Sequence, residues 1–266
     1  MEKKYQKLVA LLGEMDGALV AFSGGVDSSL LLCAAVEALG ERAVAVTAVS
    51  AASPPGEENQ AGGVARVLGV QHIKVQTDEV TDPRYRENSP DRCYYCKGIL
   101  FSKLKELAGE QGLAGGVVEG SNMDDLGDYR PGRKALQEHG IRSPLVEVEL
   151  TKDEIRALAK ERKLPVWDTP SAACLASRVP YGQEITPERL LRIGRAEAFL
   201  RALGFRQLRV RDHGAVARLE VEPLEIGRFA DDKLRAVVVD ELKGLGFSYV
   251  ALDLMGYRPG ALNEVL

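Results

Sequence analysis

The residues with the clearest capacity for chemistry form a loop of glycines and hydroxyls, Ser23-Gly24-Gly25-Val26-Asp27-Ser28-Ser29. Glycine lets a backbone turn sharply and approach a ligand, and the start of a helix offers unpaired N–H groups to an anion. Asp27 would repel a phosphate, so its presence favours a Mg²⁺ ion beside it. The loop therefore predicts a nucleotide phosphate site, although it lacks the Walker A pattern G-x-x-x-x-G-K-[ST]. A glycine-rich turn without a ligand is the alternative.

The cysteines are a second candidate for chemistry. Cys93 and Cys96 stand two residues apart, so both thiolates can reach one metal ion, and Cys174 lies in a separate segment. The pair could instead be a redox pair, part of a zinc site or two unrelated thiols. A closed zinc site needs a fourth ligand, and there is no second C-x-x-C. Together with Cys174, the pair could hold a [4Fe–4S] cluster that leaves one iron open; Cys33 is interpreted as a buried apolar residue.

Alternating strands and helices are predicted to position these residues. We expect strands at 18–22, 44–49, 72–76, 115–119 and 141–148, and helices at 5–15, 28–39, 57–68 and 151–163, the last opened by a capping box from Thr151 to Glu154. This order is typical of βαβ units with a doubly wound, mostly parallel sheet. Asn122, Asp124 and Asp125 follow a strand, at the sheet edge where such folds bind ligands, although an Asx-rich turn would look the same.

The pattern changes near residue 185, which predicts a second, smaller α+β domain. Thr186 and Pro187 open a helix to about residue 202, and strands are expected through 211, at 216–221 and at 249–254. Another helix is expected over 224–242. A helix–Leu-Gly-Phe–strand unit occurs twice, with Gly204 and Gly246 at left-handed helix ends. We therefore predict domains at 1–183 and 184–266, the second for substrate binding or oligomerisation.

Composition limits the classes of protein. The chain has 266 residues, of which 45% are hydrophobic and 28% charged, and its formal net charge is −4. This is ordinary globular composition without a basic field that would attract nucleic acid or an anionic membrane. The sequence shows neither a bilayer-length apolar run nor a signal-peptide pattern, so we expect a cytoplasmic protein with no membrane partner.

Several segments together resemble one family. The loop at 23–28 resembles the SGGxDS loop of the PP-loop ATP pyrophosphatases, whose fold is adenine nucleotide alpha hydrolase-like. Within that superfamily, the sequence is similar to the LarE-type ATP-dependent sulfur transferases over nearly its whole length. The similarity is clearest at Cys93-Tyr94-Tyr95-Cys96-Lys97, 119–125, 128–132, 171–181 and 209–220.

The resemblance implies a reaction. ATP would adenylate a carboxylate of pyridinium-3,5-biscarboxylic acid mononucleotide, releasing pyrophosphate, and sulfur would then displace AMP to give a thiocarboxylate. The product belongs to biosynthesis of the nickel-pincer cofactor of lactate racemase. In one version of the family, the cysteine matching Cys174 gives up its own sulfur. In the other, three cysteines hold a [4Fe–4S] cluster that carries a transferable sulfide, and Cys93, Cys96 and Cys174 match this version.

We expect specific roles for the residues of both domains. The catalytic set is Asp27, Cys93, Cys96 and Cys174, with Asp27 also the Mg²⁺ ligand. The expected ATP contacts are Ser23, Gly24, Gly25, Val26, Asp27, Ser28, Gly120, Asp125 and Arg178. Eight arginines against three acids between residues 188 and 218 favour an anionic ligand, a mononucleotide or RNA. The expected substrate contacts are Arg130, Arg133, Arg211, Arg218 and Glu220.

Alternatives of other classes remain open from the sequence. Sacrifice of the Cys174 sulfur is the first, a tRNA thiolation enzyme is the second, and a non-catalytic protein that binds a nucleotide and zinc is the third. The acidic balance argues against a nucleic-acid partner. The expected partners are the small mononucleotide, a sulfur donor such as sulfide or a desulfurase, and, by the resemblance, further copies of the same chain.

Overall fold

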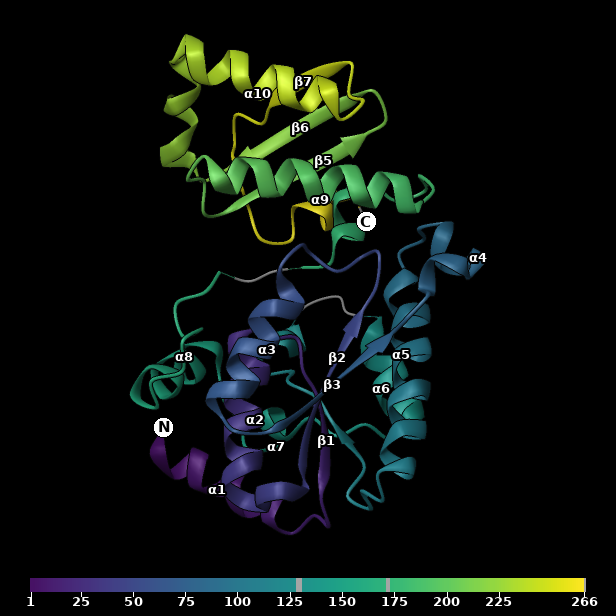
Figure 1. Ribbon diagram of the computed structural model, residues 1–266, viewed down its shortest axis with the longest axis vertical. Helices are drawn as coiled ribbons and strands as arrows, with labels where there is room; N and C mark the ends of the chain where they lie inside the picture. Colours follow the sequence, from purple (N-terminus) through teal and green to yellow (C-terminus); the bar gives the residue numbers. More distant parts are fainter. Residues whose placement is uncertain (128–130, 171–172, 266) are drawn as a thin grey trace. The chain divides into compact units, whose positions relative to one another are not determined.

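The computed structural model describes residues 1–127, 131–170 and 173–265 (Figure 1). The chain forms two compact units. The N-terminal unit comprises Met1–Ser50, Gly56–Glu79 and Cys93–Ser171, and the C-terminal unit comprises Ala51–Pro55, Val80–Arg92 and Ala172–Leu266. The predicted boundary lies at 183/184, whereas this division begins the last segment of the C-terminal unit at residue 172 and adds two short segments of the N-terminal half to that unit.

A four-stranded parallel sheet forms the centre of the N-terminal unit, in the order β3-β2-β1-β4. Its strands are β1 (Ala18–Ala21), β2 (Ala43–Val49), β3 (Gln71–Gln76) and β4 (Val117–Val118). Parallel neighbours require crossover connections, and the helices that alternate with the strands supply them, which confirms the predicted α/β class.

The expectation of a strand over 141–148 is wrong. Arg142 makes one parallel bridge to Val118, and Pro144–Glu147 forms the short helix α7. Proline lacks the N–H that a strand ladder needs, and its fixed φ suits the first turn of a helix. The apolar side chains of this segment are therefore buried by a helix instead of a fifth strand.

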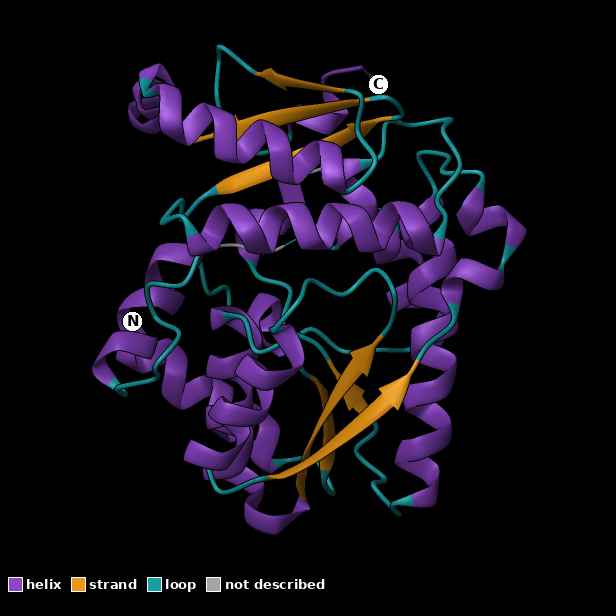
Figure 2. Cartoon of the chain, turned by 45° about the horizontal axis from the view of Figure 1, so that its top comes forward, coloured by secondary structure: helices purple, strands orange, loops and turns teal. Residues whose placement is uncertain are grey.

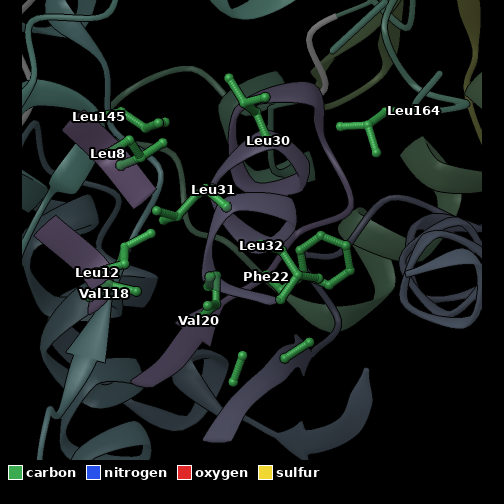
Figure 3. Packing of buried hydrophobic residues seen from close by; sticks show 14 of the residues in the cluster. Leu8, Leu12, Val20, Phe22, Leu30, Leu31, Leu32, Val118, Leu145 and Leu164 are labelled. Carbon is green, nitrogen blue, oxygen red and sulfur yellow. The ribbon is translucent and has the colours of Figure 1, made fainter. Parts of the chain in front are cut away.

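Helices cover both faces of the sheet (Figure 2). One face packs against α1 (Glu2–Gly13), α2 (Val26–Leu39), α3 (Glu57–Val67), α7 and α8 (Lys152–Glu161). The other face packs against α5 (Arg92–Glu110) and α6 (Gly132–His139). Figure 3 shows Leu30, Leu31 and Leu32 of α2 among the buried side chains of the first face. Helix α2 buries most of its surface, as expected for a helix that is apolar nearly all round, and this fixes its N-terminus firmly.

The C-terminal unit contains a smaller mixed sheet. Strands β5 (Leu208–His213) and β6 (Val216–Val221) are antiparallel, and β7 (Tyr249–Leu252) runs parallel to β6. Helices α9 (Pro187–Ala202) and α10 (Asp232–Gly244) share its apolar core. Thr186 caps α9 as predicted, and Gly204 and Gly246 have φ values of 89° and 97°. The helix expected over 224–242 is divided, because Asp231 caps α10 after the 3-10 segment Pro223–Ala230.

Short elements complete the described chain. They are α4 (Pro83–Arg86) and the 3-10 segments η1 (Gly40–Arg42), η2 (Glu79–Thr81), η3 (Met123–Gly127), η4 (Leu175–Arg178) and η6 (Ala261–Val265). Among the helices that the structure describes, none has the length and apolar character needed to cross a membrane.

Candidate functional site

The glycine-rich loop joins β1 to the start of α2. Gly24 has a φ of 75°, and a Cβ there would lie 2.8 Å from the Ala61 backbone, so this position requires glycine. Gly25 is the N-cap, and no side chain in the described ranges caps the helix. The first-turn amides of a helix have no intrahelical acceptor, so at this end they are open to an anion. The hydroxyl oxygens of Ser23 and Ser28 lie 3.2 Å apart beside them.

Asp27 in the first turn of α2 is held by two partners. Its carboxylate forms an ion pair with Lys152 and accepts a hydrogen bond from Asn122 Nδ2 at 3.2 Å. Lys152 is the first residue of α8, and its backbone N–H donates to Asp124 Oδ2 at 2.5 Å. Lys152 is not among the residues predicted for the site. The capping box formed by Thr151 and Glu154, which the structure confirms, was the sequence signal that places this lysine at the start of α8.

The turn after β4 closes around the same helix start. Buried Glu119 accepts hydrogen bonds from the amide and hydroxyl of Ser121, at 3.0 and 2.9 Å. A Cβ on Gly120 would lie 3.0 Å from the Ser28 amide nitrogen, so glycine lets the turn approach the start of α2 this closely without displacing it. Asp125 accepts a hydrogen bond from the backbone of Asn122 at 3.0 Å. The turn thus brings Gly120 and Asn122 to the phosphate loop, whereas the described hydrogen bond of Asp125 stays within the turn.

The carboxyl group of Glu57, at the start of α3, is a weaker acid than usual. Burial raises the pKa of its carboxyl group to about 7, and the positive charge of Lys97 opposes this rise only in part. Lys97 lies on α5, directly after Cys96, with its ammonium 5.4 Å from the Phe101 ring centroid. A carboxyl group that is half protonated near neutrality makes the stability of this unit depend on pH.

We expect Glu57→Gln to raise the Tm at pH 8 and to leave it nearly unchanged at pH 5. The folded-state pKa of about 7 lies above the ordinary value of 4.5, so wild-type stability falls as the pH rises through this window. The amide carries no charge to desolvate. Thermal unfolding at both pH values tests this, with Glu58→Gln as the control, because Glu58 is half-exposed beside Lys74. An identical pH dependence in wild type and Glu57→Gln would contradict it.

The cysteines are divided between the units. Cys93 and Cys96 lie one turn apart at the start of α5, where residues three apart share a helix face. Cys174 is exposed and belongs to the C-terminal unit. Cys33 packs against the core of the N-terminal unit, and burial raises the pKa of its thiol. Within residues 1–127, 131–170 and 173–265, no three His, Cys, Asp or Glu side chains form a group suited to a metal ion.

Arg178 holds the segment that carries Cys174. Its guanidinium group is fully buried and makes a bidentate ion pair with Glu197, with Nε–Oε1 and Nη2–Oε2 distances of 2.7 and 2.9 Å. Its Nη1 atom donates to the carbonyl oxygens of Ala173 and Cys174, at 2.7 and 3.0 Å. Arg178 is among the residues expected to contact the nucleotide. In the structure, its Nε, Nη1 and Nη2 atoms all donate to protein atoms of the C-terminal unit.

Asn88 joins the segment before Cys93 to the segment after Cys174. It is fully buried with a φ of 54°, and Nδ2 donates to the carbonyl oxygens of Val179, Pro180 and Gln183 at 2.7–3.2 Å. Its Oδ1 atom accepts a hydrogen bond from Arg92 at 2.6 Å. Within the C-terminal unit, the residue directly before Cys93 is therefore tied to the chain that follows Cys174.

The expected substrate arginines have different environments. Arg211 and Arg218 are cross-strand neighbours, and both pair with buried Glu220 at 2.8–2.9 Å. The Arg211 side chain is 6% exposed and that of Arg218 is 38% exposed, so Arg218 has the more accessible guanidinium group. Arg133 on α6 donates to the Leu126 carbonyl at 3.4 Å. Arg130 lies outside the described residues.

No protein-family model matches the chain. It is 46% identical over 269 residues to an uncharacterised protein of Synechocystis sp. strain PCC 6803, covering 100% of this chain and 99% of the relative. It is 38% identical over 266 residues to the pyridinium-3,5-bisthiocarboxylic acid mononucleotide synthase of Lactiplantibacillus plantarum, covering 99% and 95%. It is 28% identical over 159 residues to one of the subunits of the glutamine-hydrolysing GMP synthase of Methanocaldococcus jannaschii, covering 56% and 50%.

The second of these relatives matches the chain almost from end to end, and the third, which matches 56% of the chain, shares the PP-loop superfamily. The parallel sheet and the open start of α2 agree with both. The chain therefore belongs to the LarE family of ATP-dependent sulfur transferases, within the PP-loop superfamily.

Proposed function

We propose that this enzyme uses ATP and Mg²⁺ to convert a carboxylate of pyridinium-3,5-biscarboxylic acid mononucleotide into a thiocarboxylate. The observation that carries the proposal is the start of α2, where first-turn amides open to an anion stand beside Asp27, Lys152 and two hydroxyls. The name of the Lactiplantibacillus plantarum relative supplies the substrate class.

The first step is an adenylation. A carboxylate oxygen of the substrate attacks the α-phosphorus of ATP, and the bond between the α-phosphorus and the bridging oxygen breaks. The electron pair leaves with pyrophosphate, whose negative charge the amides at the start of α2 and the Lys152 ammonium stabilise. The carboxylate then carries AMP, a far better leaving group than oxide.

Magnesium fits the acidic side of this site. Mg²⁺ in nucleotide sites is held by one or two carboxylates together with phosphate oxygens and water, and the partly exposed Asp27 provides one carboxylate. Its carboxylate already pairs with the Lys152 ammonium and accepts a hydrogen bond from the Asn122 side-chain amide. The surroundings of Asp27 therefore suit a positive ion. Bound there, Mg²⁺ would neutralise the phosphates. Lys152 would then be free to turn from Asp27 to the departing pyrophosphate.

The second step replaces AMP by sulfur. A sulfur nucleophile attacks the carbonyl carbon of the acyl-adenylate, the C–O bond to AMP breaks, and AMP leaves with the electron pair. We propose that Cys93, Cys96 and Cys174 hold a [4Fe–4S] cluster, which supplies a transferable sulfide when bound. The shared helix face of Cys93 and Cys96, and the Asn88 link between the chain before Cys93 and the chain after Cys174, support this ligand set. Sulfide or a desulfurase would replace the sulfide that the cluster transfers. We also propose that several copies of the chain associate.

The sacrificial route is the second candidate, and the exposure of Cys174 favours it. In that route, the Cys174 thiolate displaces AMP and forms a thioester. Loss of the Cα proton and breakage of the Cβ–S bond then yield the thiocarboxylate, a proton and dehydroalanine at position 174. The step needs no external oxidant or reductant, but each chain can act only once.

One assay tests the proposed function. Anaerobic protein is incubated with ATP, Mg²⁺, sulfide and the biscarboxylic mononucleotide, and pyrophosphate and thiocarboxylate are both measured. We expect equal amounts of the two products. The same mononucleotide with both carboxylates amidated is the control, because an amide lacks the attacking oxygen. Absence of carboxylate-dependent pyrophosphate release would overturn the proposal.

We expect Lys152→Met to lower pyrophosphate release by about 10²-fold, because a preorganised charge is lost beside the leaving group. Loss of the ammonium also leaves Asp27 without its ion pair, so calorimetry should show tighter binding of Mg²⁺ to the nucleotide-free variant. Lys160→Met is the matched control, because Lys160 lies on the same helix with its ammonium against the Trp167 ring. Unchanged release and unchanged Mg²⁺ affinity in Lys152→Met would exclude this role.

A further inference from the structure

We propose that Arg178 is a positioning residue that fixes Cys174 for the sulfur-transfer step and has no part in adenylation. The inference rests on the proposed function for its chemistry, and on contacts within the C-terminal unit for its geometry. Those contacts begin at Cys174, whose side chain is exposed while the backbone around it is held at several points.

The carbonyl group of Cys174 accepts hydrogen bonds from two side chains and from the Ser177 amide, the latter at 3.1 Å. Arg178 Nη1 donates to it at 3.0 Å, and Ser177 Oγ donates at 2.9 Å. Arg178 Nη1 also donates to the preceding carbonyl, of Ala173, at 2.7 Å. Two successive peptide groups are thus fixed by one guanidinium nitrogen. The Cα of Cys174 lies between these two peptide groups and carries the Cβ, so rotation about χ1 is the main movement left to the sulfur atom.

The chain after Cys174 is fixed as well. The amide of Leu175 donates to the Ala52 carbonyl at 2.8 Å, and the Leu175 side chain is buried. A Cβ on Gly194 of α9 would lie 3.2 Å from both Leu175 Cδ1 and Pro55 Cγ, so the helix packs closely at this point. Arg211 Nη1 donates to the Ser177 carbonyl at 2.6 Å. The exposed cysteine therefore stands on a rigid base.

Glu197 holds the guanidinium group of Arg178 in its orientation. The carboxylate is fully buried and accepts both Nε and Nη2 of Arg178, as well as the amide of Val210 at 3.2 Å. The nearby arginines, Arg178 first, keep the pKa of Glu197 below its ordinary value although burial alone would raise it. A bidentate pair leaves the guanidinium plane one orientation, which aims Nη1 at the Cys174 segment. Buried ion pairs add little net stability to a fold. The fixed orientation of the Arg178 guanidinium group is therefore better explained by a positioning role than by stability.

Sulfur transfer depends on this geometry and adenylation does not. A displacement of about 1 Å of a reacting atom can cost on the order of 10²-fold in rate. The phosphate loop belongs to the N-terminal unit, whereas Arg178, Glu197 and Cys174 belong to the C-terminal unit. We call the hydrogen bonds from Arg178 to the Ala173 and Cys174 carbonyls, together with its ion pair to Glu197, the Arg178 clamp. Loss of this clamp should slow sulfur transfer while pyrophosphate is still released.

The test uses full-length protein and two variants. Arg178→Lys keeps the positive charge but cannot make the bidentate pair and reach two carbonyls together. Arg178→Met/Glu197→Gln removes the paired guanidinium and carboxylate together and keeps an acceptor for Val210, so no Glu197 carboxylate is left without its Arg178 partner. Arg201→Ala is the matched control, because Arg201 also pairs with Glu197, at 2.9 Å, but is 37% exposed.

We expect thiocarboxylate formed per pyrophosphate released to fall about 10- to 100-fold in both variants, with pyrophosphate release within twofold of wild type. Amide hydrogen exchange at residues 174–178 should quicken in the same variants and stay slow in Arg201→Ala. An unchanged product ratio, or an equal loss of both products in a folded variant, would overturn the positioning role. If wild type makes no thiocarboxylate, the proposed function fails separately, and unchanged exchange at 174–178 would still reject the clamp.

Discussion

Asp27→Ala is expected to lower pyrophosphate release by at least about 10³-fold, the largest loss predicted for any single change in the N-terminal unit. The carboxylate is the acidic group placed in the first turn of α2, where the phosphates are proposed to bind. Without it, the proposed Mg²⁺ would lose the Asp27 carboxylate that is expected to hold it beside the phosphates. The Lys152 ammonium also loses its partner and is no longer held in place by an ion pair.

Binding measurements separate loss of the metal anchor from a collapsed site. Asp27 repels phosphate in the absence of a cation, so calorimetry should show that Asp27→Ala binds metal-free ATP at least as well as wild type does. Added Mg²⁺ should strengthen ATP binding in wild type alone. Asp153→Ala provides the control, because Asp153 is an exposed carboxylate in the first turn of α8. Undiminished pyrophosphate release from Asp27→Ala would refute the assignment of the site.

Much of the N-terminal unit could be predicted because its signals are local. A glycine pair before a buried helix, and a threonine followed three residues later by glutamate, each specify a turn or cap through nearby atoms. The structure confirms both. The ion pair between Asp27 and Lys152 joins residues 125 positions apart, and no local pattern specifies that separation. Asp27 could therefore be predicted from the sequence, whereas its partner Lys152 could not.

The C-terminal unit shows the same limit for charged residues. Eight arginines between 188 and 218 favoured an anionic ligand, yet several are paired with buried carboxylates. Asp212 and Glu197 are fully buried because strands β5 and β6 and helix α9 enclose them, and each accepts hydrogen bonds from two arginines. A sequence gives the number of charges but not which of them neutralise one another. The pairing of Arg178 with Glu197, 19 residues away, likewise has no local signal in the sequence.

Secondary-structure errors arose where a competing signal stood inside an apolar run. Pro144 begins a helix within the segment expected to be a fifth strand, and Asp231 begins α10 within the segment expected to be one long helix. In each case a single residue fixes a boundary through its own backbone or side chain. The apolar pattern indicated burial correctly at Leu145 and Val238, but not over Pro223–Ala230, where no residue is buried and Leu224 is exposed, and it does not encode the interruptions.

The second large effect is expected from the cysteines. Protein purified without oxygen should be brown and contain iron and acid-labile sulfide, and Cys93→Ser or Cys96→Ser should lose the colour and reduce multiple-turnover thiocarboxylate formation by more than about 10²-fold. Pyrophosphate release should persist in both variants, because the phosphate loop is separate from α5. Cys33→Ala is the control, since Cys33 packs against the core. A colourless wild type with full turnover would exclude the cluster.

Intact mass after turnover distinguishes the two sources of sulfur. If the cluster delivers sulfide, the mass of the chain is unchanged, and each chain forms many thiocarboxylates while sulfide is supplied. If Cys174 gives up its own sulfur, the chain becomes lighter by H₂S at residue 174, and product stops at one thiocarboxylate per chain. We expect Cys174→Ser to abolish product in either route and Cys93→Ser to do so only in the first, because α5 would provide ligands to the proposed cluster but no sulfur to the thioester. A chain that lost H₂S while Cys93→Ser kept full single-turnover yield would therefore establish the sacrificial route.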